Sequence, residues 1–318
     1  MVAVGIVVLV VALLAAGGAP KPLPAGLSGA SMPVSWALPV LRFVADVATI
    51  ACAGALLGAV VLLPSDGGKL AAQGLRAVQD AAIAAGIWAV ASLAGLVATA
   101  SVILGVPLSH LGEHASLAGG LNQVRSLAVT IVLTAILAVV LSGCRTVVTA
   151  RVCLVLAAAA VVGPLLNGHE AIVRTNLWSV LATASLVVHV FAATVWIGGL
   201  GALLRYTRER PAIERFSALA LSCAVAVGAT GLLTAEIHLD GREGGWGLIT
   251  QWVTSGYGAL VFAKAVAFAA LVCIGWWHRR ATLPLLADRP AAFWRLAAGE
   301  IVLMAGTVGL AVALSRTP

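Results

Sequence analysis

Histidine is the residue type in this chain whose chemistry and placement are most informative. Five of the six histidines fall in loops or half-segments that, by alternation of apolar spans, belong to one side of a membrane. Imidazoles gathered on one face of a polytopic membrane protein are typical of a metal or haem site. These five residues are His110, His114, His169, His189 and His238.

His189 differs from the other four because it lies well inside a long apolar segment, SLVVHVFAATVWIGGLGALL. A neutral imidazole in such a place must still satisfy its N–H, so it needs a partner on a neighbouring helix or a metal. Trp196 lies two helical turns further along the same face, and Gly198 and Gly199 follow where another backbone can approach. We therefore predict a functional site at His189, with Trp196 and the two glycines packed nearby.

The other four histidines lie in loops or at segment ends. His110 and His114 are four residues apart in PLSHLGEHASL, with Glu113 beside them, and in a helix they would point the same way. Such a pair can bind a divalent metal, although it is a weak motif without further ligands. His169 and His238 each follow the end of an apolar segment. All four are candidate ligands, and the alternative for each is a solvated surface histidine.

Charged residues inside the apolar segments form a second group. Arg42 and Asp46 are separated by four residues, so they share a helical face and can neutralise one another. Lys264 and Glu300 enter their segments from opposite sides, and the rise of a helix brings their depths within ~6 Å. We expect both pairs to be structural ion pairs that could also line a polar path for an ion.

Cysteine and methionine contribute little to the expected chemistry. The five cysteines form no CxxC pair and lie in or near apolar segments, where small buried hydrophobic roles are favoured over metal ligation. Only three methionines occur, so the sequence does not predict a methionine-lined Cu(I) pathway.

The composition of the chain indicates that these residues lie in a membrane protein. Hydrophobic residues make up 61% of the chain and charged residues 10%, which is typical of an integral membrane protein. We predict an all-α polytopic bundle of about nine spans, or eight if the first is a cleaved signal, forming one transmembrane domain over residues 1–318. The predicted segments are about 3–18, 34–63, 80–105, 124–142, 149–166, 179–204, 213–237, 256–278 and 293–314.

Basic residues set the expected orientation. Twelve of the 19 Lys and Arg residues fall in or beside the even-numbered loops, which the positive-inside rule places in the cytoplasm. The N-terminus is then inside, the C-terminus outside, and the five histidines face outward. The net charge of +7 is explained by this arrangement, so nucleic acid is not an expected partner.

Several fragments resemble one family of membrane proteins. They are GHE at 168–170, HVFAATVWIGGLGALL at 189–204, ERFSALALSCAVAVGATGLL at 214–233, TSGYGALVFAKAVAFAALVCIGWWHRR at 254–280 and RLAAGEIVLMAGTVGLAVALSRTP at 295–318. In order and spacing they resemble the copper resistance protein D (CopD) family over about residues 165–318. Residues 1–164 are similar to it only in their number of spans. The matching motif positions are His169, His189, Trp196, Tyr257, Lys264 and Glu300.

The resemblance implies a copper transport or homeostasis protein of the bacterial cytoplasmic membrane that is not an enzyme. It implies a periplasmic copper-binding protein as donor and, by analogy with fused relatives, a possible oxidase assembly module as partner. The scarcity of methionine favours capture of Cu(II) by imidazole and carboxylate. The expected path runs from His169, helped by His110, His114 or His238, to His189. Two alternatives remain: a b-type haem cytochrome with histidines on adjacent helices, and a scaffold that delivers copper to an oxidase without transporting it.

Overall fold

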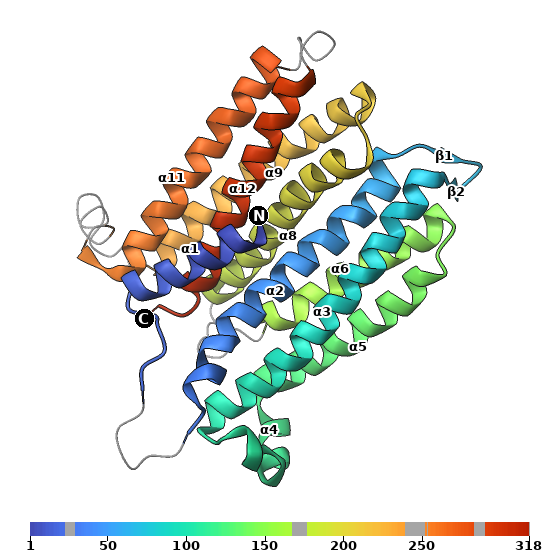
Figure 1. Cartoon of the computed structure of the whole chain (residues 1–318). Helices are drawn as coiled ribbons and strands as arrows, with labels where there is room; N and C mark the ends of the chain where they lie inside the picture. Colours follow the sequence, from blue (N-terminus) through green and yellow to red (C-terminus); the bar gives the residue numbers. More distant parts are fainter. Residues whose placement is uncertain (23–28, 167–176, 239–251, 253, 283–289, 318) are drawn as a thin grey trace.

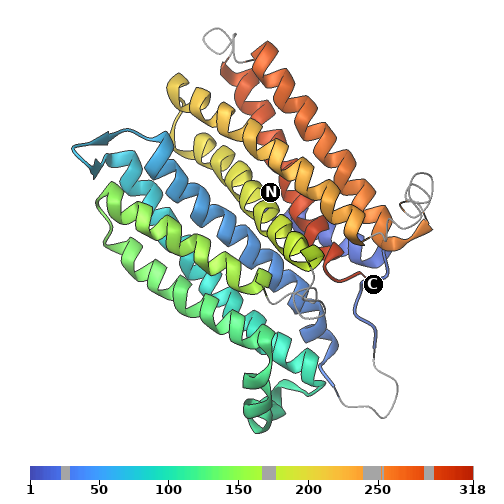
Figure 2. The same cartoon turned by 180° about the vertical axis from the view of Figure 1, so that it is seen from behind.

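The computed structural model describes residues 1–22, 29–166, 177–238, 252, 254–282 and 290–317. Most of these residues are helical (Figures 1 and 2), because in hydrocarbon only a helix satisfies its backbone hydrogen bonds within one segment. The elements are α1 (Val2–Ala15), α2 (Met32–Leu57), η1 (Gly58–Leu62), β1 (Ser65–Asp66), β2 (Lys69–Leu70), α3 (Ala72–Leu104), η2 (Leu108–His114), α4 (Ala115–Gly120), α5 (Asn122–Ser142), α6 (Val147–Leu166), α8 (Leu177–Tyr206), α9 (Arg210–His238), α11 (Gly256–Trp277), η4 (His278–Thr282) and α12 (Pro290–Leu314).

Eight helices among the described residues are long and apolar enough to cross a membrane. They correspond to the second to ninth predicted segments, so the predicted all-α polytopic bundle is confirmed. The largest difference in a boundary is at α3, which begins at Ala72 rather than near residue 80. Its first turns carry Arg76 and Asp80 and extend the helix beyond its apolar part.

The first predicted segment forms α1, a helix of 14 residues. At 1.5 Å per residue it is ~21 Å long, shorter than the ~30 Å hydrocarbon core. Helix α1 packs on α12 and α2, where Leu9 and Leu13 are buried with Phe43. A side chain at Gly5 would lie 2.9 Å from the Ala305 carbonyl oxygen, so the helices approach closely at this point.

Contacts between helices divide the eight long helices into two groups of four. In the N-terminal bundle, α2 contacts α3, α3 contacts α5, α5 contacts α6, and α6 returns to α2. The C-terminal bundle repeats this order with α8, α9, α11 and α12. Figures 1 and 2 show the two bundles side by side, with α1 lying against the C-terminal one.

The two bundles meet where α2 crosses α8. A side chain built at Gly198 would lie 2.8 Å from the Cα of Gly54, and Gly58 faces Ala202 one turn further along. Because lipid provides no hydrophobic drive for helices to associate, small residues at the crossing allow the close packing that holds them together. The close approach predicted for these glycines is confirmed.

The predicted even-numbered loops gather at one end of the molecule (Figure 1). A β-hairpin of β1 and β2 turns through Gly67 and Gly68, both with positive φ, as a two-residue type I′ turn requires. The amide of Leu70 then donates to the carbonyl of Arg145 in the loop between α5 and α6. Basic residues therefore cluster at this end, which we call the basic end; its placement in the cytoplasm remains a prediction.

Candidate functional site

His189 lies on α8 and points into the C-terminal bundle toward α9. Its Nδ1 is 3.0 Å from the Oγ1 of Thr230, and an added side chain at Gly231 would lie 3.5 Å from its Cε1. Gly231 therefore lets the imidazole ring pack closely against α9. The prediction that a buried imidazole here must find a partner across a helix interface is confirmed by this contact.

The bonding of Thr230 determines which imidazole nitrogen carries the proton. The Thr230 hydroxyl donates to the backbone carbonyl of Ala226, one turn back on α9. With its single proton used there, the hydroxyl oxygen accepts from His189, so the N–H of the ring is at Nδ1. The lone pair of the ring is then at Nε2. A metal-binding histidine is commonly oriented in this way, with one nitrogen held by an outer partner and the other available as ligand.

Helix α11 contributes the other groups near this site. Lys264 lies on α11, which packs against α9 and α12. One turn further along α11, Phe268 meets Trp196 of α8 in an edge-to-face contact with ring centroids 6.2 Å apart. His189 and Thr230 thus form a polar layer, and the aromatic pair lies in an apolar layer about two helical turns further along α8.

Gly198, Gly199 and Tyr257 were predicted to pack near His189, and the structure places each of them in a different contact. Gly198 contacts α2 at the crossing between bundles, and a side chain at Gly199 would collide with the ring of Phe216 on α9. Both glycines therefore serve helix packing rather than contact with His189. Tyr257 lies in the first turn of α11, whose start is capped by the Ser255 hydroxyl accepting from the amide of Gly258.

A second polar pair lies toward the basic end of the same bundle. The Nε2 of His278 is 3.7 Å from the Oε1 of Glu300, and both residues are only 8% exposed. The predicted pairing of Glu300 with Lys264 is therefore wrong. Lys264 precedes His278 by fourteen residues of nearly continuous helix, a rise of ~21 Å, which places it at a different depth.

Comparison with known families identifies the region that contains most of these groups. Residues 210–314 match the family described as Copper resistance protein D. This part of the chain is therefore similar to the CopD family. No curated protein and no solved structure matched the chain.

The CopD region covers α9, α11 and α12, three of the four helices of the C-terminal bundle. Thr230, Lys264, His278 and Glu300 lie within it, whereas His189 precedes it on α8. The predicted resemblance is thus confirmed for residues 210–314 of the expected 165–318. The eight long apolar helices among the described residues indicate a membrane protein, and the matched region is similar to proteins described as Copper resistance protein D.

His110 and His114 lie far along the chain from the CopD region, in η2 between α3 and α5. His110 Nδ1 is 3.4 Å from Glu113 Oε1, and His114 Nδ1 bonds to the carbonyl of His110 at 3.1 Å. Both bonds are local and exposed. No group of three or more His, Cys, Asp or Glu side chains suited to a metal occurs within the described parts of the chain.

Two further predicted ligands cannot be placed. His169 lies outside the described residues. His238 is the last residue of α9, and its side chain also lies outside the described part. Both remain sequence predictions.

Arg42 and Asp46 form the predicted ion pair on α2, with Nε and Oδ1 3.3 Å apart. The side chains are 46% and 34% exposed, so the pair is only partly enclosed. It belongs to the N-terminal bundle and is separate from the polar layer around His189. This geometry supports the prediction that Arg42 and Asp46 form a structural ion pair.

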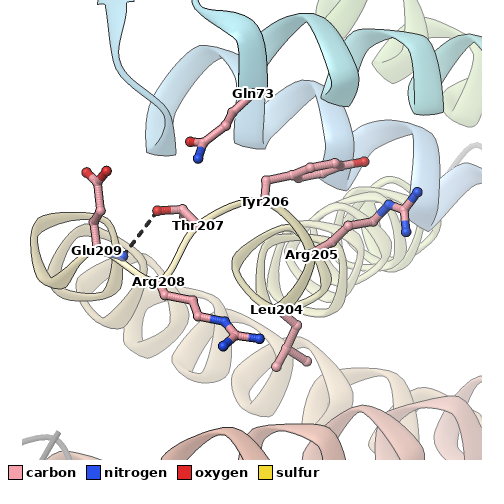
Figure 3. Close-up of a pocket in the computed structure, with 7 residues that line it drawn as sticks. All are labelled: Gln73, Leu204, Arg205, Tyr206, Thr207, Arg208 and Glu209. Atoms are coloured by element: carbon pink, nitrogen blue, oxygen red, sulfur yellow. Dashed lines mark hydrogen bonds between the residues drawn. The ribbon is translucent and has the colours of Figure 1, made fainter.

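A pocket of about 400 Å³ opens at the basic end (Figure 3). It is lined by Gln73, Leu204, Arg205, Tyr206, Thr207, Arg208 and Glu209. Figure 3 shows Arg205 and Arg208 pointing to different sides, so the charged groups do not converge on one ligand position. Asp80 accepts hydrogen bonds from Arg205 and Tyr206, both 2.7 Å long, which ties α3 to the end of α8. These contacts link the two bundles.

The cysteines behave as small hydrophobic residues. Four of the five are buried, and all are free. Burial raises the pKa of the Cys144 thiol between α5 and α6, partly offset by the backbone of Thr146. A raised pKa keeps the thiol protonated at neutral pH and makes it a poor metal ligand.

Proposed function

We propose that this protein binds copper at the outer face of the bacterial cytoplasmic membrane and moves it into or across the C-terminal bundle. The observation that carries the proposal is the orientation of His189. Its Nδ1 contacts Thr230, which leaves Nε2 as the nitrogen able to bind a metal, and it lies against a region of the CopD family. Imidazole nitrogen is a suitable ligand for copper.

Lys264 would help to release copper from His189. A protonated Lys264 on the neighbouring helix α11 would repel a metal cation bound at His189. Copper would therefore be held more weakly than by an isolated imidazole site. A transport site needs binding that is favourable enough for entry and weak enough for exit.

Capture at the outer face is assigned to the remaining candidate ligands. His169 would take copper from a periplasmic copper-binding protein, with help from His110, His114 or His238. The exposed pair in η2 lies at the end of the molecule opposite the basic end (Figure 1), in keeping with this role. The protein acts by binding and movement, and no catalysed reaction is proposed.

Copper uptake into vesicles tests the proposal. The protein is reconstituted into liposomes, copper is supplied outside, and accumulated copper is measured for the wild type, His189→Ala and Val188→Ala. Val188 is adjacent on α8 and exposed, so it is a matched control. We expect uptake by the wild type and the control, and a loss of at least tenfold in His189→Ala. Equal uptake in all three would refute the role of His189.

The same experiment separates transport from delivery to an oxidase assembly module. A scaffold would bind copper with His189 intact but show no uptake into vesicles. The haem alternative requires a second histidine at the depth of His189, and the described residues place none there. An absorption spectrum of the purified protein with a Soret band would support haem and contradict the proposal.

A further inference from the structure

The pair of His278 and Glu300 was not anticipated from the sequence and has no part in the path proposed above. Helix α11 ends at Trp277, and the π-helical turn η4 begins at His278. Glu300 comes from α12, which runs beside α11. Two ionisable side chains on different helices, each only 8% exposed, are costly in a membrane protein unless they are paired or used.

The spacing of the pair suits a shared cation. The 3.7 Å between His278 Nε2 and Glu300 Oε1 exceeds a direct hydrogen bond. Imidazole nitrogen and carboxylate oxygen each bind a divalent transition metal at about 2.0–2.2 Å, so two such ligands of one ion lie less than about 4.4 Å apart. The observed distance falls within that limit without movement of either helix.

Neighbouring cations are directed away from the pair. Arg279 bonds through Nε and Nη2 to the hydroxyl and carbonyl oxygens of Ser217 on α9. The Arg280 guanidinium lies 5.1 Å from the ring centroid of Trp276. Although both arginines follow His278 directly in the chain, each has a partner elsewhere. Glu300 therefore keeps its carboxylate available to a positive ligand.

Apolar side chains also pack around the pair. The ring of Phe293 meets His278 edge-to-face, with centroids 4.8 Å apart. Met304 follows Glu300 by one turn of α12, is 1% exposed, and shares a hydrophobic cluster with Phe293.

From this arrangement we propose that His278 and Glu300 form a second copper-binding site, near the basic end of the C-terminal bundle. It would receive the ion after His189, across the apolar layer that contains Trp196 and Phe268. This inference rests on the proposed function for the identity of the ion. The evidence for a site is the position and spacing of His278 and Glu300.

Copper binding to purified full-length protein in detergent tests the second site. Each variant is incubated with a Cu(II) salt, passed through gel filtration with excess glycine to remove weakly held copper, and analysed for copper per chain. The decisive variants share a His189→Ala background, which removes the first site. To this background we add Glu300→Gln, His278→Asn or, as a control, Glu214→Gln. Glu214 is an exposed carboxylate paired with Arg210 at the same end of the bundle.

We expect about one retained copper per chain in His189→Ala and in its Glu214→Gln derivative, and at least a fivefold loss in the Glu300→Gln and His278→Asn derivatives. Equal copper in all four proteins would overturn the second site. A copper absorption-edge spectrum of His189→Ala, which leaves the second site unaltered, gives an independent reading. Imidazole and oxygen scattering supports the site, and a spectrum without imidazole overturns it.

The outcome also separates this inference from the proposed function. If wild-type protein loses copper on mutation of His189 but not of His278 or Glu300, the first site stands and the second fails. If copper depends on His278 and Glu300 but not on His189, the second stands and the proposed entry site fails. Wild-type protein without bound copper would contradict both.

Discussion

In the N-terminal bundle the buried hydroxyl groups bond to backbone carbonyls, whereas in the C-terminal bundle imidazole and carboxylate side chains meet polar groups on other helices. Thr134 donates to the carbonyl of Thr130 four residues earlier, and Ser101 donates to that of Val106. All fully buried polar side chains described in the N-terminal bundle are Ser or Thr. In the C-terminal bundle the fully buried polar side chains include His278 and Glu300 besides Ser and Thr, and the half-buried His189 contacts Thr230 on α9.

This difference suggests that the N-terminal bundle is a scaffold and that the candidate site lies in the C-terminal bundle. Thr49 and Thr134 donate to carbonyls of their own helices and need nothing from a neighbour, although Thr130 donates to the Ala160 carbonyl on α6. A buried imidazole or carboxylate depends on a partner at a fixed position, and its presence in hydrocarbon is costly. We infer that the N-terminal bundle positions α8 through the α2 crossing, and that the C-terminal bundle contains the polar path.

The crossing between the bundles gives the largest expected effect. In Gly54→Ala the new methyl group would collide with the backbone of Gly198, so α2 and α8 must separate. We expect a loss of about 3 kcal/mol in the free energy of unfolding, measured in mixed micelles. Gly86→Ala on α3 is the control, because its methyl group meets nothing within 4 Å. Similar stability of the two variants would mean that the crossing does not hold the bundles together.

The contact of Thr230 with His189 provides the next test. Thr230→Val keeps the shape of the side chain but removes the oxygen that accepts from Nδ1. Loss of such an outer partner typically weakens metal binding 10- to 100-fold, and we expect copper affinity to fall by about that factor. Thr230→Ser should restore it. Unchanged affinity in Thr230→Val would show that this contact does not orient the ligand.

Lys264 should act in the opposite direction. Lys264→Met removes a cation on the neighbouring helix α11, so copper bound at the His189 ring should be held more tightly. We expect a gain of about tenfold in affinity, equivalent to about 1.4 kcal/mol, measured by competition with a chelator. Slower release should accompany it. Weaker binding in this variant would indicate that Lys264 stabilises the site instead of opposing the ion.

The smallest effect is expected in the N-terminal bundle. Thr134→Val removes a buried hydroxyl that serves only a carbonyl of its own helix. The expected change in the free energy of unfolding is about 1 kcal/mol or less, with copper binding unaltered. A loss of copper in this variant would contradict the division between scaffold and site.

The sequence predicted features that depend on one helix or on side-chain size. Long apolar segments predicted the eight crossing helices, and the small Gly198 and Gly199 predicted a close approach of another backbone to α8. The spacing of Arg42 and Asp46 was enough to predict their ion pair. Each of these follows from helical periodicity, membrane thickness or the space that a glycine leaves.

Features that depend on which helices are neighbours could not be predicted in this way. His278 lies in the stretch WWHRR, which indicates a membrane interface in sequence, but its contact with Glu300 depends on how α11 and α12 pack. Thr230 has no charge and little effect on hydropathy, so nothing in the sequence distinguished it as the partner of His189. The predicted first segment extended to residue 18, beyond the end of α1 at Ala15, because the apolar run continues through Ala16, Gly17 and Gly18.

The central claim is that copper binds inside the C-terminal bundle, at His189. Anomalous diffraction at the copper edge from crystals of the copper-loaded protein tests it most directly. We expect an anomalous peak within ~2.2 Å of His189 Nε2, on the side of the ring away from Thr230, and its absence from crystals of His189→Ala. Anomalous peaks confined to the exposed histidines of η2, or to the N-terminal bundle, would contradict the account.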